Sequence, residues 1–416
     1  MRLLARVTTA ALIALAPVLA GTPSSAAPAQ DPAPLIASKD AVPGRAPAQD
    51  PAPLIASKDA VPGHYIVTLD AGIDPATLAG QLKVEPTFTY SKALNGFAVP
   101  LTPTQLTLVR SALGVKTVEE DSKVSTPSAE GPGAVGTRAA PSSSWGLDRI
   151  DQQALPLDND FTTQNNGSGV TAYILDTGID YTHEEFGGRA VLGFDAMPDA
   201  DTQQGLDCNG HGTHVAGTVG GKTYGVASGV NLVSVRVLGC DGKGSYSGMI
   251  AGLDWVAKNA QQPAVLNGSL GGPKSEALNS AADALTDAGV LPVIAAGNDA
   301  RDACDVSPAS ASRVLAVAAS NRYDEETDFS NFGTCVALYA PGEGISSAKL
   351  GGGSVDLDGT SMAAPHVAGV AALYKQAHPD DLPEAIVEFI DDQSTKDVLT
   401  KVSKSSPNQL LYTAGL

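Results

Sequence analysis

The chain has 416 residues, of which 43% are hydrophobic, and its 45 acidic and 26 basic side chains give a formal net charge of -19. This length and composition allow a full hydrophobic core and two or three domains, which excludes a disordered protein. The acidic balance argues against binding to the phosphate backbone of nucleic acids, so we expect no nucleic-acid partner.

Residues 1–26 have the features of a secretory signal peptide. Arg2 and Arg6 supply positive charge, residues 10–20 form an apolar stretch too short to span a bilayer, and small residues follow at 23–27. No later run approaches about 20 uninterrupted apolar residues. We therefore expect a secreted, extracellular protein without a membrane anchor in its mature form.

A tandem repeat follows the signal peptide. Residues 27–44 (APAQDPAPLIASKDAVPG) recur unchanged as residues 46–63, with a period of 19 residues. Solenoid folds need about three copies and a face to bury, and these Pro/Ala-rich copies provide neither. We interpret residues 27–63 as a duplicated, flexible linker without functional weight.

Residues 64–124 are predicted to form a small α+β domain. A strand at 65–69 precedes a helix at 75–83, two strands flank Asn95-Gly96, and a helix at 102–113 precedes a strand at 115–118. This β-α-β-β-α-β order is ferredoxin-like. The Gly/Pro/Ser/Ala-rich residues 125–144 that follow are predicted to be an exposed linker open to proteolysis.

Residues 145–416 alternate between apolar strands and helices. Near-continuous apolar runs occur at 170–175, 232–238 and 290–295, and helical segments begin at His211, Ser247, Ser275 and Ser361. Such runs are buried on both faces, which predicts a mainly parallel sheet flanked by helices. In sheets of this kind the functional site lies beyond the carboxyl ends of the strands.

Four candidate residues stand at ends of these elements: Asp176, His211, Asn298 and Ser361. Taken singly, each has an ordinary interpretation as a turn or a helix cap. His211 and His214 could in principle bind zinc, but no third ligand is placed for it and the HExxH pattern is absent.

Together the four residues supply an acid, a base, an amide donor and a nucleophile. A serine becomes nucleophilic when a histidine takes its proton, and a carboxylate orients and stabilises the imidazolium that forms. The Asn298 amide and the Ser361 N–H can receive the charge of an oxyanion. The chain order Asp, His, Ser is that of subtilisin.

Residues 145–416 resemble the subtilases, specifically the secreted proteinase K-like and aqualysin-like group. The motifs DTGID, HGTHVAG, AAGN and GTSMAAPHVAG occur in the family's order. The resemblance implies a three-layer subtilisin-like domain and a serine endopeptidase that needs no cofactor for catalysis. It assigns the triad to Asp176, His211 and Ser361, the oxyanion donor to Asn298, and structural roles to His214 and His366.

The same resemblance implies the residues that bind substrate. The pocket for the residue before the cut is implied to be walled by Ser269, Leu270, Gly271, Gly272, Ala295, Ala296 and Gly297. The edge that pairs with extended substrate is implied to be Gly244, Ser245 and Tyr246. Because no pocket residue is charged, we expect broad cleavage of polypeptides after aromatic or aliphatic residues.

Residues 64–124 resemble the propeptide inhibitor of this group in PGHYIVTL and LNGFAV. The resemblance implies a self-processing zymogen, in which this domain assists folding, blocks the cleft and is cut away within the linker. We expect the mature enzyme to be a monomer whose partners are polypeptide substrates and its own propeptide.

The four cysteines, Cys208, Cys240, Cys304 and Cys335, lack the close pairing of a zinc site. In an exported chain an even count favours disulfides, with three connectivities open. The resemblance to aqualysin-type enzymes implies the pairs Cys208–Cys240 and Cys304–Cys335.

A structural calcium ion is also implied. The acidic segment that contains Asp148, Asp151, Gln152, Asp158 and Asp160 resembles a calcium loop of cold-adapted and aqualysin-like relatives, and clustered oxygens suit this ion. An acidic surface turn is the alternative. The strong calcium site of proteinase K is predicted to be lost, because Ala337 stands at the position of its carboxylate.

One departure from the family concerns Gly268, where many relatives carry methionine or leucine. Losing a large buried side chain costs about 2–5 kcal/mol unless neighbours fill the space. The main alternative function is a catalytically silent binding or inhibitor protein on the same fold, which would need none of the four candidate residues. An α/β-hydrolase is disfavoured because that fold predicts a GxSxG motif and an acid after the serine.

Overall fold

A computed structural model describes residues 50–126 and 144–416. The predicted signal peptide, the first copy of the repeat and nearly all of the predicted linker lie outside the described residues. Among those described, no helix combines the length and the apolar character needed to cross a membrane.

The N-terminal domain contains the predicted ferredoxin-like order of elements. Its elements are β1 (Leu54–Ile55), β2 (Ala60–Leu69), α1 (Pro75–Leu82), β3 (Phe88–Tyr90), β4 (Gly96–Pro100), α2 (Pro103–Arg110) and β5 (Val115–Ser125). The sheet has the order β1-β5-β2-β4-β3. Asp74 caps α1 by accepting from Thr77 N at 2.7 Å, and Thr102 and Gln105 form a capping box at α2.

The start of this domain differs from the prediction. The second copy of the repeat is not a linker throughout, because Leu54 and Ile55 pair with Val118 and Glu119 of β5, and β2 begins at Ala60. Ala52 is buried in the core of the domain. Backbone pairing along β5 therefore extends the folded domain N-terminally beyond residue 64.

The C-terminal domain starts with α3 and alternates strands with helices. Its elements up to the sheet centre are α3 (Trp145–Ile150), β6 (Thr171–Asp176), β7 (Ala190–Asp195), α4 (Ala200–Gln203), α5 (His211–Gly220), β8 (Asn231–Arg236), β9 (Lys243–Ser245), α6 (Tyr246–Asn259) and β10 (Ala264–Gly268). They are followed by β11 (Gly272–Pro273), α7 (Glu276–Asp287), β12 (Leu291–Ala295), η1 (Ala303–Asp305), β13 (Val306–Ser307), β14 (Leu315–Ser320) and β15 (Leu338–Pro341). The last elements are β16 (Ile345–Ala348), β17 (Ser354–Leu357), α8 (Thr360–Ala377), α9 (Pro383–Gln393), β18 (Thr395–Lys396) and β19 (Gln409–Leu410).

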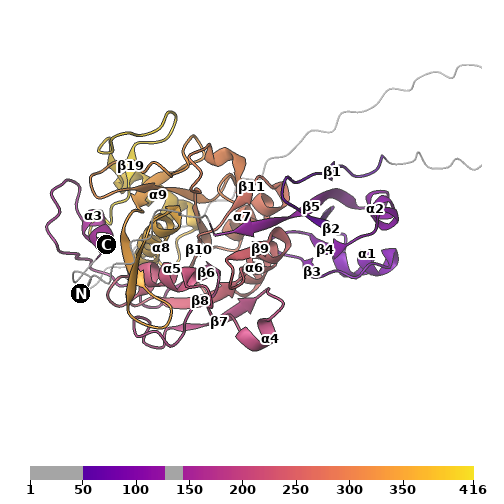
Figure 1. Cartoon of the computed structure of the whole chain (residues 1–416), viewed down its shortest axis with the longest axis horizontal. Helices are drawn as coiled ribbons and strands as arrows, with labels where there is room; N and C mark the ends of the chain where they lie inside the picture. The colour runs from indigo at the N-terminus through magenta and orange to yellow at the C-terminus, as the bar shows by residue number, and fades with distance from the viewer. Residues whose placement is uncertain (1–49, 127–143) are drawn as a thin grey trace, which may run out of the picture. The chain divides into compact units, whose positions relative to one another are not determined.

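The main sheet has the order β18-β19-β15-β14-β12-β10-β6-β8-β7. Its pairs are parallel except for β18 with β19, so the predicted mainly parallel sheet is confirmed. Helices cover both faces, with α5 and α8 on one side of β6 and β10 and α6 and α7 on the other (Figure 1). Alternate residues of β6 serve the two faces, since Ile174 packs with α5 and α8 whereas Leu175 packs with α6.

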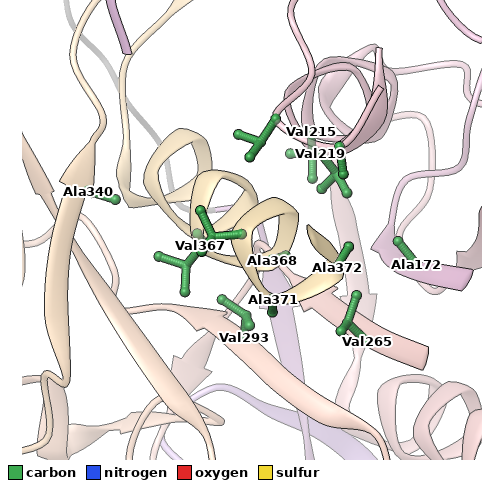
Figure 2. Packing of buried hydrophobic residues seen from close by; sticks show 14 of the residues in the cluster. Ala172, Val215, Val219, Val265, Val293, Ala340, Val367, Ala368, Ala371 and Ala372 are labelled. Atoms are coloured by element: carbon green, nitrogen blue, oxygen red, sulfur yellow. The ribbon is translucent and has the colours of Figure 1, made fainter. Parts of the chain in front are cut away.

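Helix α8 lies inside the domain. All of its residues from Thr360 to Lys375 are buried. Its small residues Ala368, Ala371 and Ala372 face strand residues such as Val265 and Val293, and α5 lies alongside it (Figure 2). Small side chains let the helix axis approach the sheet and α5 closely, which fixes where the helix begins.

Two disulfides join Cys208 to Cys240 and Cys304 to Cys335, as the resemblance implied. They span sequence separations of 32 and 31 residues. In the chain-entropy account, a cross-link that closes a loop of about this size raises the free energy of unfolding by roughly 3–4 kcal/mol.

The space at Gly268 is filled by its neighbours. A Cβ built on Gly268 would lie 2.8 Å from Cδ1 of Ile294, with Leu266 and Leu175 next nearest. The glycine therefore leaves no room for the larger residue that many relatives carry.

We predict that Gly268→Met lowers the free energy of unfolding by about 1–3 kcal/mol, because the added atoms would overpack this position. Gly268→Ala is the matched control and should cost less, since the atom it meets is the flexible end of Ile294. Thermal unfolding of both variants in the Ser361→Ala background measures the difference. A methionine variant as stable as its parent would contradict this packing.

Candidate active site

The candidate site lies where the chain changes direction within the main sheet. Strand β6 stands between β8 and β10, and the chain passes from β6 to β7 and β8 on one side before it crosses to β10 on the other. This topology opens a crevice at the carboxyl ends of the strands. Asp176 is the last residue of β6 and is fully buried there.

Asp176 is in contact with His211. The Nδ1 atom of His211 lies 2.8 Å from Oδ1 of Asp176, and the N–H of Thr177 donates to the same oxygen at 2.7 Å. His211 is the first residue of α5, after Gly210 at φ 109°, where glycine is favoured. The Nε2 atom of His211 is buried and has no hydrogen-bond partner within the described part of the chain.

The electrostatic surroundings of His211 favour its charged form. Burial by itself lowers the pKa of this imidazole, but the Asp176 carboxylate and the nearby charge of Asp207 outweigh burial and raise the pKa above its ordinary value of 6.5. The other two histidines in the motifs behave in the opposite way. Burial lowers the pKa of His214 to about 3 and that of His366 to about 4, so both are neutral.

Sequence reasoning missed Asp207, which links β6 to the start of α5. Its Oδ1 accepts from Thr177 Oγ1 and from Gly210 N, each at 2.9 Å, and its Oδ2 accepts from Thr213 Oγ1 at 2.6 Å. Thr177 Oγ1 in turn accepts from Gly212 N at 2.9 Å. Asp207 stands two residues before the NGHGTH motif, and this closeness was the available signal for a role at the site. Its partners, however, are separated from it by up to 30 residues.

Ser361 and Asn298 meet through Thr360, a second residue that sequence reasoning did not single out. The N–H and the Oγ1 of Thr360 donate to Asn298 Oδ1 at 2.9 and 2.7 Å, and Gly297 N donates to Thr360 Oγ1 at 3.0 Å. With its oxygen held in this way, Asn298 has Nδ2 as its donor group. That atom lies 3.0 Å from a Cβ built on Gly359, directly before this helix.

Ser361 is buried at the start of α8 and is bonded to Ser269. Its Oγ donates to the carbonyl of Ser269 at 3.3 Å, and its own carbonyl accepts from Ser269 Oγ at 2.9 Å. Pro365, inside α8, has no N–H to give to the carbonyl of Ser361 four residues earlier. The side chain of Ser269 supplies a donor to that carbonyl instead.

The predicted substrate edge is paired with the N-terminal domain. Val124 and Ser125 of β5 pair with Gly244 and Lys243 of β9, and Ser125 forms an antiparallel bridge with Gly271. The end of β5 therefore lies in extended form between the predicted edge and one wall of the predicted pocket.

Three of the predicted substrate residues do not present side chains in the expected way. Ser245 caps α6, so the chain turns into a helix at Tyr246, whose ring is buried and whose hydroxyl bonds to Pro273 O. Tyr246 is therefore not part of the paired edge. The side chains of Leu270 and Ala296 pack into hydrophobic clusters, which leaves them only backbone groups to offer a substrate.

The remaining predicted pocket residues follow strand ends. Gly272 pairs with Ser307 in a small antiparallel sheet, and Ala295 is the last residue of β12. Gly297 adopts φ 105°, and a Cβ on it would lie 2.3 Å from Asn331 Nδ2. That position therefore requires glycine.

The residues of the predicted calcium loop use their oxygens for backbone N–H groups. Asp148 accepts from Asp158 N at 3.2 Å and Asn159 N at 2.9 Å, and Asp151 accepts from Thr162 N at 2.8 Å. Across residues 50–126 and 144–416, no three His, Cys, Asp or Glu residues are grouped to hold a metal ion. The loop as it stands does not form a ready cation site.

Within the same loop, Gln152 accepts from Asp158 N at 3.2 Å and donates to Pro156 O, while Asp160 accepts from Phe161 N at 2.9 Å. Burial and the neighbouring carboxylates raise the pKa values of Asp148 and Asp151. At the other predicted position, the side chain of Ala337 packs against the main core.

The carboxyl edge of this parallel sheet thus carries an aspartate–imidazole pair, and also a serine whose neighbour Thr360 is bonded to an amide side chain. These are the kinds of group that a serine hydrolase uses. Residues 167–410 match the family model described as the Subtilase family, and residues 76–127 match the Peptidase inhibitor I9 model. The chain therefore belongs to the subtilase family of serine proteases and carries an inhibitor-type propeptide domain.

Similar proteins agree with this assignment. The chain is 48% identical over 332 residues to the alkaline serine exoprotease A of Vibrio alginolyticus, covering 80% of this chain and 60% of that protein. It is 46% identical to the extracellular serine proteinase of Thermus sp. strain Rt41A, covering 78% and 77% of the two chains. A crystal structure of a cold adapted subtilisin-like serine proteinase is 48% identical, with a TM-score of 0.63, over 66% of this chain and 99% of that one.

We predict that His211 titrates above pH 6.5, whereas His214 and His366 stay neutral between pH 5 and 8. Replacing Asp176 by Asn should lower the pKa of His211, because it removes the nearest negative charge. The raised pKa adds stability that is full below pH 6.5 and is lost as pH rises through the folded-state value. Imidazole NMR titration measures each histidine; an unchanged His211 pKa in the Asn variant would contradict this.

Proposed function

We propose that this protein is a secreted serine endopeptidase made as a self-processing zymogen, with Asp176, His211 and Ser361 as its triad and Asn298 as oxyanion donor. The observation that carries the proposal is the Asp176–His211 pair, in which the second imidazole nitrogen, Nε2, has no hydrogen-bond partner among the described residues. Support also comes from the membership of the chain in the subtilase family.

In the proposed reaction, Ser361 Oγ turns from the Ser269 carbonyl to His211 Nε2 and attacks the carbonyl carbon of the substrate. His211 takes the hydroxyl proton, and Asp176 stabilises the imidazolium. Asn298 Nδ2 and the Ser361 N–H stabilise the oxyanion. His211 then gives its proton to the leaving amine, and a water molecule repeats the sequence on the acyl-enzyme.

The zymogen part of the proposal is supported by the contacts of β5 and its neighbours. Asp121 accepts from Ser247 N at 3.0 Å and Ser247 Oγ at 2.6 Å, and Glu119 accepts from Ala277 N at 3.2 Å. Both carboxylates thus lie at helix N-termini, of α6 and α7, where the helix dipole favours negative charge. An extended β5 in the cleft excludes other peptides from the same edge.

On the other side of this contact, Asp254 of α6 serves the N-terminal domain. Its Oδ1 accepts from the N–H groups of Ser91, Lys92 and Ala93 at 3.0, 2.6 and 2.9 Å, and Lys258 pairs with its Oδ2 at 2.5 Å. Charge-assisted bonds of this kind are strong when buried. We infer that the propeptide domain remains bound after the first cut until it is itself degraded.

We predict that Ser361→Ala yields an unprocessed chain that a fluorophosphonate does not label, because the attacking oxygen is absent. The parent chain should appear at mature size and be labelled at Ser361. Mass spectrometry of both proteins, produced in cells that lack other proteases, gives the two readouts. A processed Ala variant would exclude self-processing, and an unlabelled parent would favour a catalytically silent binding protein.

The proposed specificity is broad, with aromatic or aliphatic residues before the cut. Gly271, Gly272, Ala295 and Gly297 offer no charge to a substrate side chain. Charged residues that border the same cleft have both signs, for example Lys274 and Asp305, so they impose no single preference. Backbone pairing along Gly244 and Ser245 would supply affinity for any extended peptide.

A panel of peptides that differ only in the residue before the cut tests this proposal. We expect kcat/KM to be highest for Phe, Tyr, Leu and Ala and at least about 10-fold lower for Lys and Arg, since burying an unpaired charge is costly. Peptides with Gln and Met at that position control for side-chain length. A strict preference for basic residues would overturn the assignment of the pocket.

We also propose that calcium stabilises the loop of residues 148–160. Its support is the raised pKa of Asp148 and of Asp151, which burial causes in the first place and the neighbouring carboxylates increase, since a bound cation would stabilise both charged forms. Binding would require the Asp148 and Asp151 oxygens to exchange backbone N–H partners for the ion. We further propose that the calcium site whose carboxylate would stand at the position of Ala337 is lost in this protein.

We predict that a chelator lowers the melting temperature of the Ser361→Ala protein by several degrees, and that added calcium restores it, because binding to the folded state alone shifts unfolding by mass action. Asp151→Asn should abolish the response. The exposed Asp392→Asn is a control that should keep it. An unchanged melting temperature in chelator would exclude calcium from this loop.

Secretion is proposed from the signal-peptide features of residues 1–26. Both disulfides support it, because such bonds persist in oxidising compartments. Sequencing the N-terminus of protein recovered from the culture medium tests the export of the chain directly.

A further inference from the structure

The loop that carries Asn298 connects β12 to η1. Residues 296–300 in it form neither helix nor strand, and both Gly297 and Ala300 have positive φ, at 105° and 50°. Thr360 of α8 holds the side-chain oxygen of Asn298, but the direction in which Nδ2 points also depends on the backbone from which the side chain starts. Groups that act in catalysis must be held within about 0.5 Å of the productive geometry, so this loop needs support of its own.

One side of the loop is bonded to Asn331, which lies between β14 and β15. Before Asn298, the Nδ2 of Asn331 donates to Ala296 O at 2.8 Å, and the N–H of Asn331 donates to Gly297 O at 2.9 Å. The amide also lies directly against the backbone there, since a Cβ built on Gly297 would be 2.3 Å from Nδ2. Asn331 thereby fixes the two residues that precede Asn298.

The other side of the loop is bonded to the same amide. The Oδ1 of Asn331 accepts from Asp299 N at 3.0 Å and from Arg301 N at 3.1 Å. A side-chain amide has both an acceptor and a donor, so one residue satisfies N–H groups after Asn298 and a carbonyl before it. The backbone is thus held on both sides of Asn298.

Asn331 is itself fixed to the main sheet. It is fully buried, and the preceding residue, Ser330, donates from Oγ to Asn331 O at 3.0 Å and accepts from Ala319 N of β14 at 3.0 Å. A fully buried side chain does not touch a substrate, so Asn331 can affect a reaction only through the residues that it holds. Hydrogen bonds therefore lead from β14 through Ser330 and Asn331 to the loop of Asn298.

We propose that Asn331 is a positioning residue of the active site, which directs the Asn298 amide at the oxyanion by fixing the loop on both sides of it. This role rests on the proposed function of Asn298 as oxyanion donor. Without the Asn331 side chain, the Ala296 carbonyl and two loop N–H groups lose these partners, and the loop shifts. Because the oxyanion forms only in the transition state, the loss should fall on kcat rather than on KM.

Two substitutions test the role of Asn331. Asn331→Ala removes the three side-chain hydrogen bonds to the loop, and Asn331→Asp keeps the acceptor but replaces the amide donor. The matched control is Asn279→Ala in α7, because Asn279 is also a buried asparagine but bonds to Ser310 Oγ instead. Each change is made in the parent chain and in the Asn298→Ala chain. For the mature enzymes, kcat and KM are measured per active site titrated with a fluorophosphonate, and melting temperatures in the Ser361→Ala background identify the folded variants.

We expect Asn298→Ala to lower kcat about 10²–10³-fold. Asn331→Ala should lower kcat about 10–100-fold with KM within about 3-fold of the parent, because a shift of about 1 Å in a catalytic group has a cost of this size. Asn331→Asp should lower kcat less, but by at least about 3-fold, and Asn279→Ala should leave it unchanged. In the Asn298→Ala chain neither change at Asn331 should lower kcat further by more than about 3-fold, since the group that Asn331 positions is gone.

The results distinguish a failure of the positioning role from a failure of the proposed function. If the folded Asn331 variants retain the parent kcat, or if their losses persist in full in the Asn298→Ala chain, Asn331 does not act through Asn298. An equal loss in Asn279→Ala would reduce the effect to general packing and would also overturn the role. If Asn298→Ala itself retains the parent kcat, the oxyanion role of Asn298 fails, and the positioning role fails with it. Should Asn331→Ala not fold, the same comparison with Asn331→Asp decides.

Discussion

The burial of α8 is the constraint on which the rest of the structure depends. A helix enclosed from Thr360 to Lys375 cannot shift along its axis without separating the sheet from α5. Such interiors are close-packed, and even a change in volume of one methylene group disturbs the packing. The first turn of the helix is thereby held at the carboxyl edge of the sheet, where Asp176 and Asn298 also emerge.

Around that edge, identical side chains acquire opposite properties from their neighbours. His214 and His366 are buried and His211 is largely buried, with 13% of its side chain exposed, yet of these three only His211 has a carboxylate against its ring. Burial without a countercharge keeps the other two imidazoles neutral, and their ring nitrogens bond to backbone groups such as Ile345 O and Met362 O. Which of these histidines can be charged is thus decided by two buried carboxylates, Asp176 and Asp207, which raise the pKa of His211.

The parts of the fold that could be predicted from the sequence are those with local signals. The parallel strands, the helices that begin at His211 and near Ser361, and the ferredoxin-like order all follow from apolar runs and caps over short windows. Asp207 and Thr360 could not be assigned in this way, because their roles arise from partners far along the chain. Tyr246 was misplaced since a cap at Ser245 ends the edge strand one residue earlier.

The repeat shows a different limit of sequence reasoning. Its Pro/Ala-rich composition resembles a linker, and only the backbone pairing of Leu54 and Ile55 with β5 shows that one copy belongs to a sheet. Gly268 shows the same dependence on context: whether a missing side chain leaves a cavity is decided by Ile294, a residue of the neighbouring strand.

Pro365 has a consequence for how Ser361 is held. Since the proline cannot bond to the Ser361 carbonyl, that carbonyl takes the Ser269 hydroxyl, and Ser269 directly follows β10. The backbone of Ser361 is therefore hydrogen-bonded to the residue that follows β10 and also belongs to its own helix. Small displacements of α8 along its axis would then be resisted at Ser361 by its hydrogen bond to Ser269, at the end of β10. A proline that would ordinarily weaken a helix here couples its first turn to the neighbouring strand.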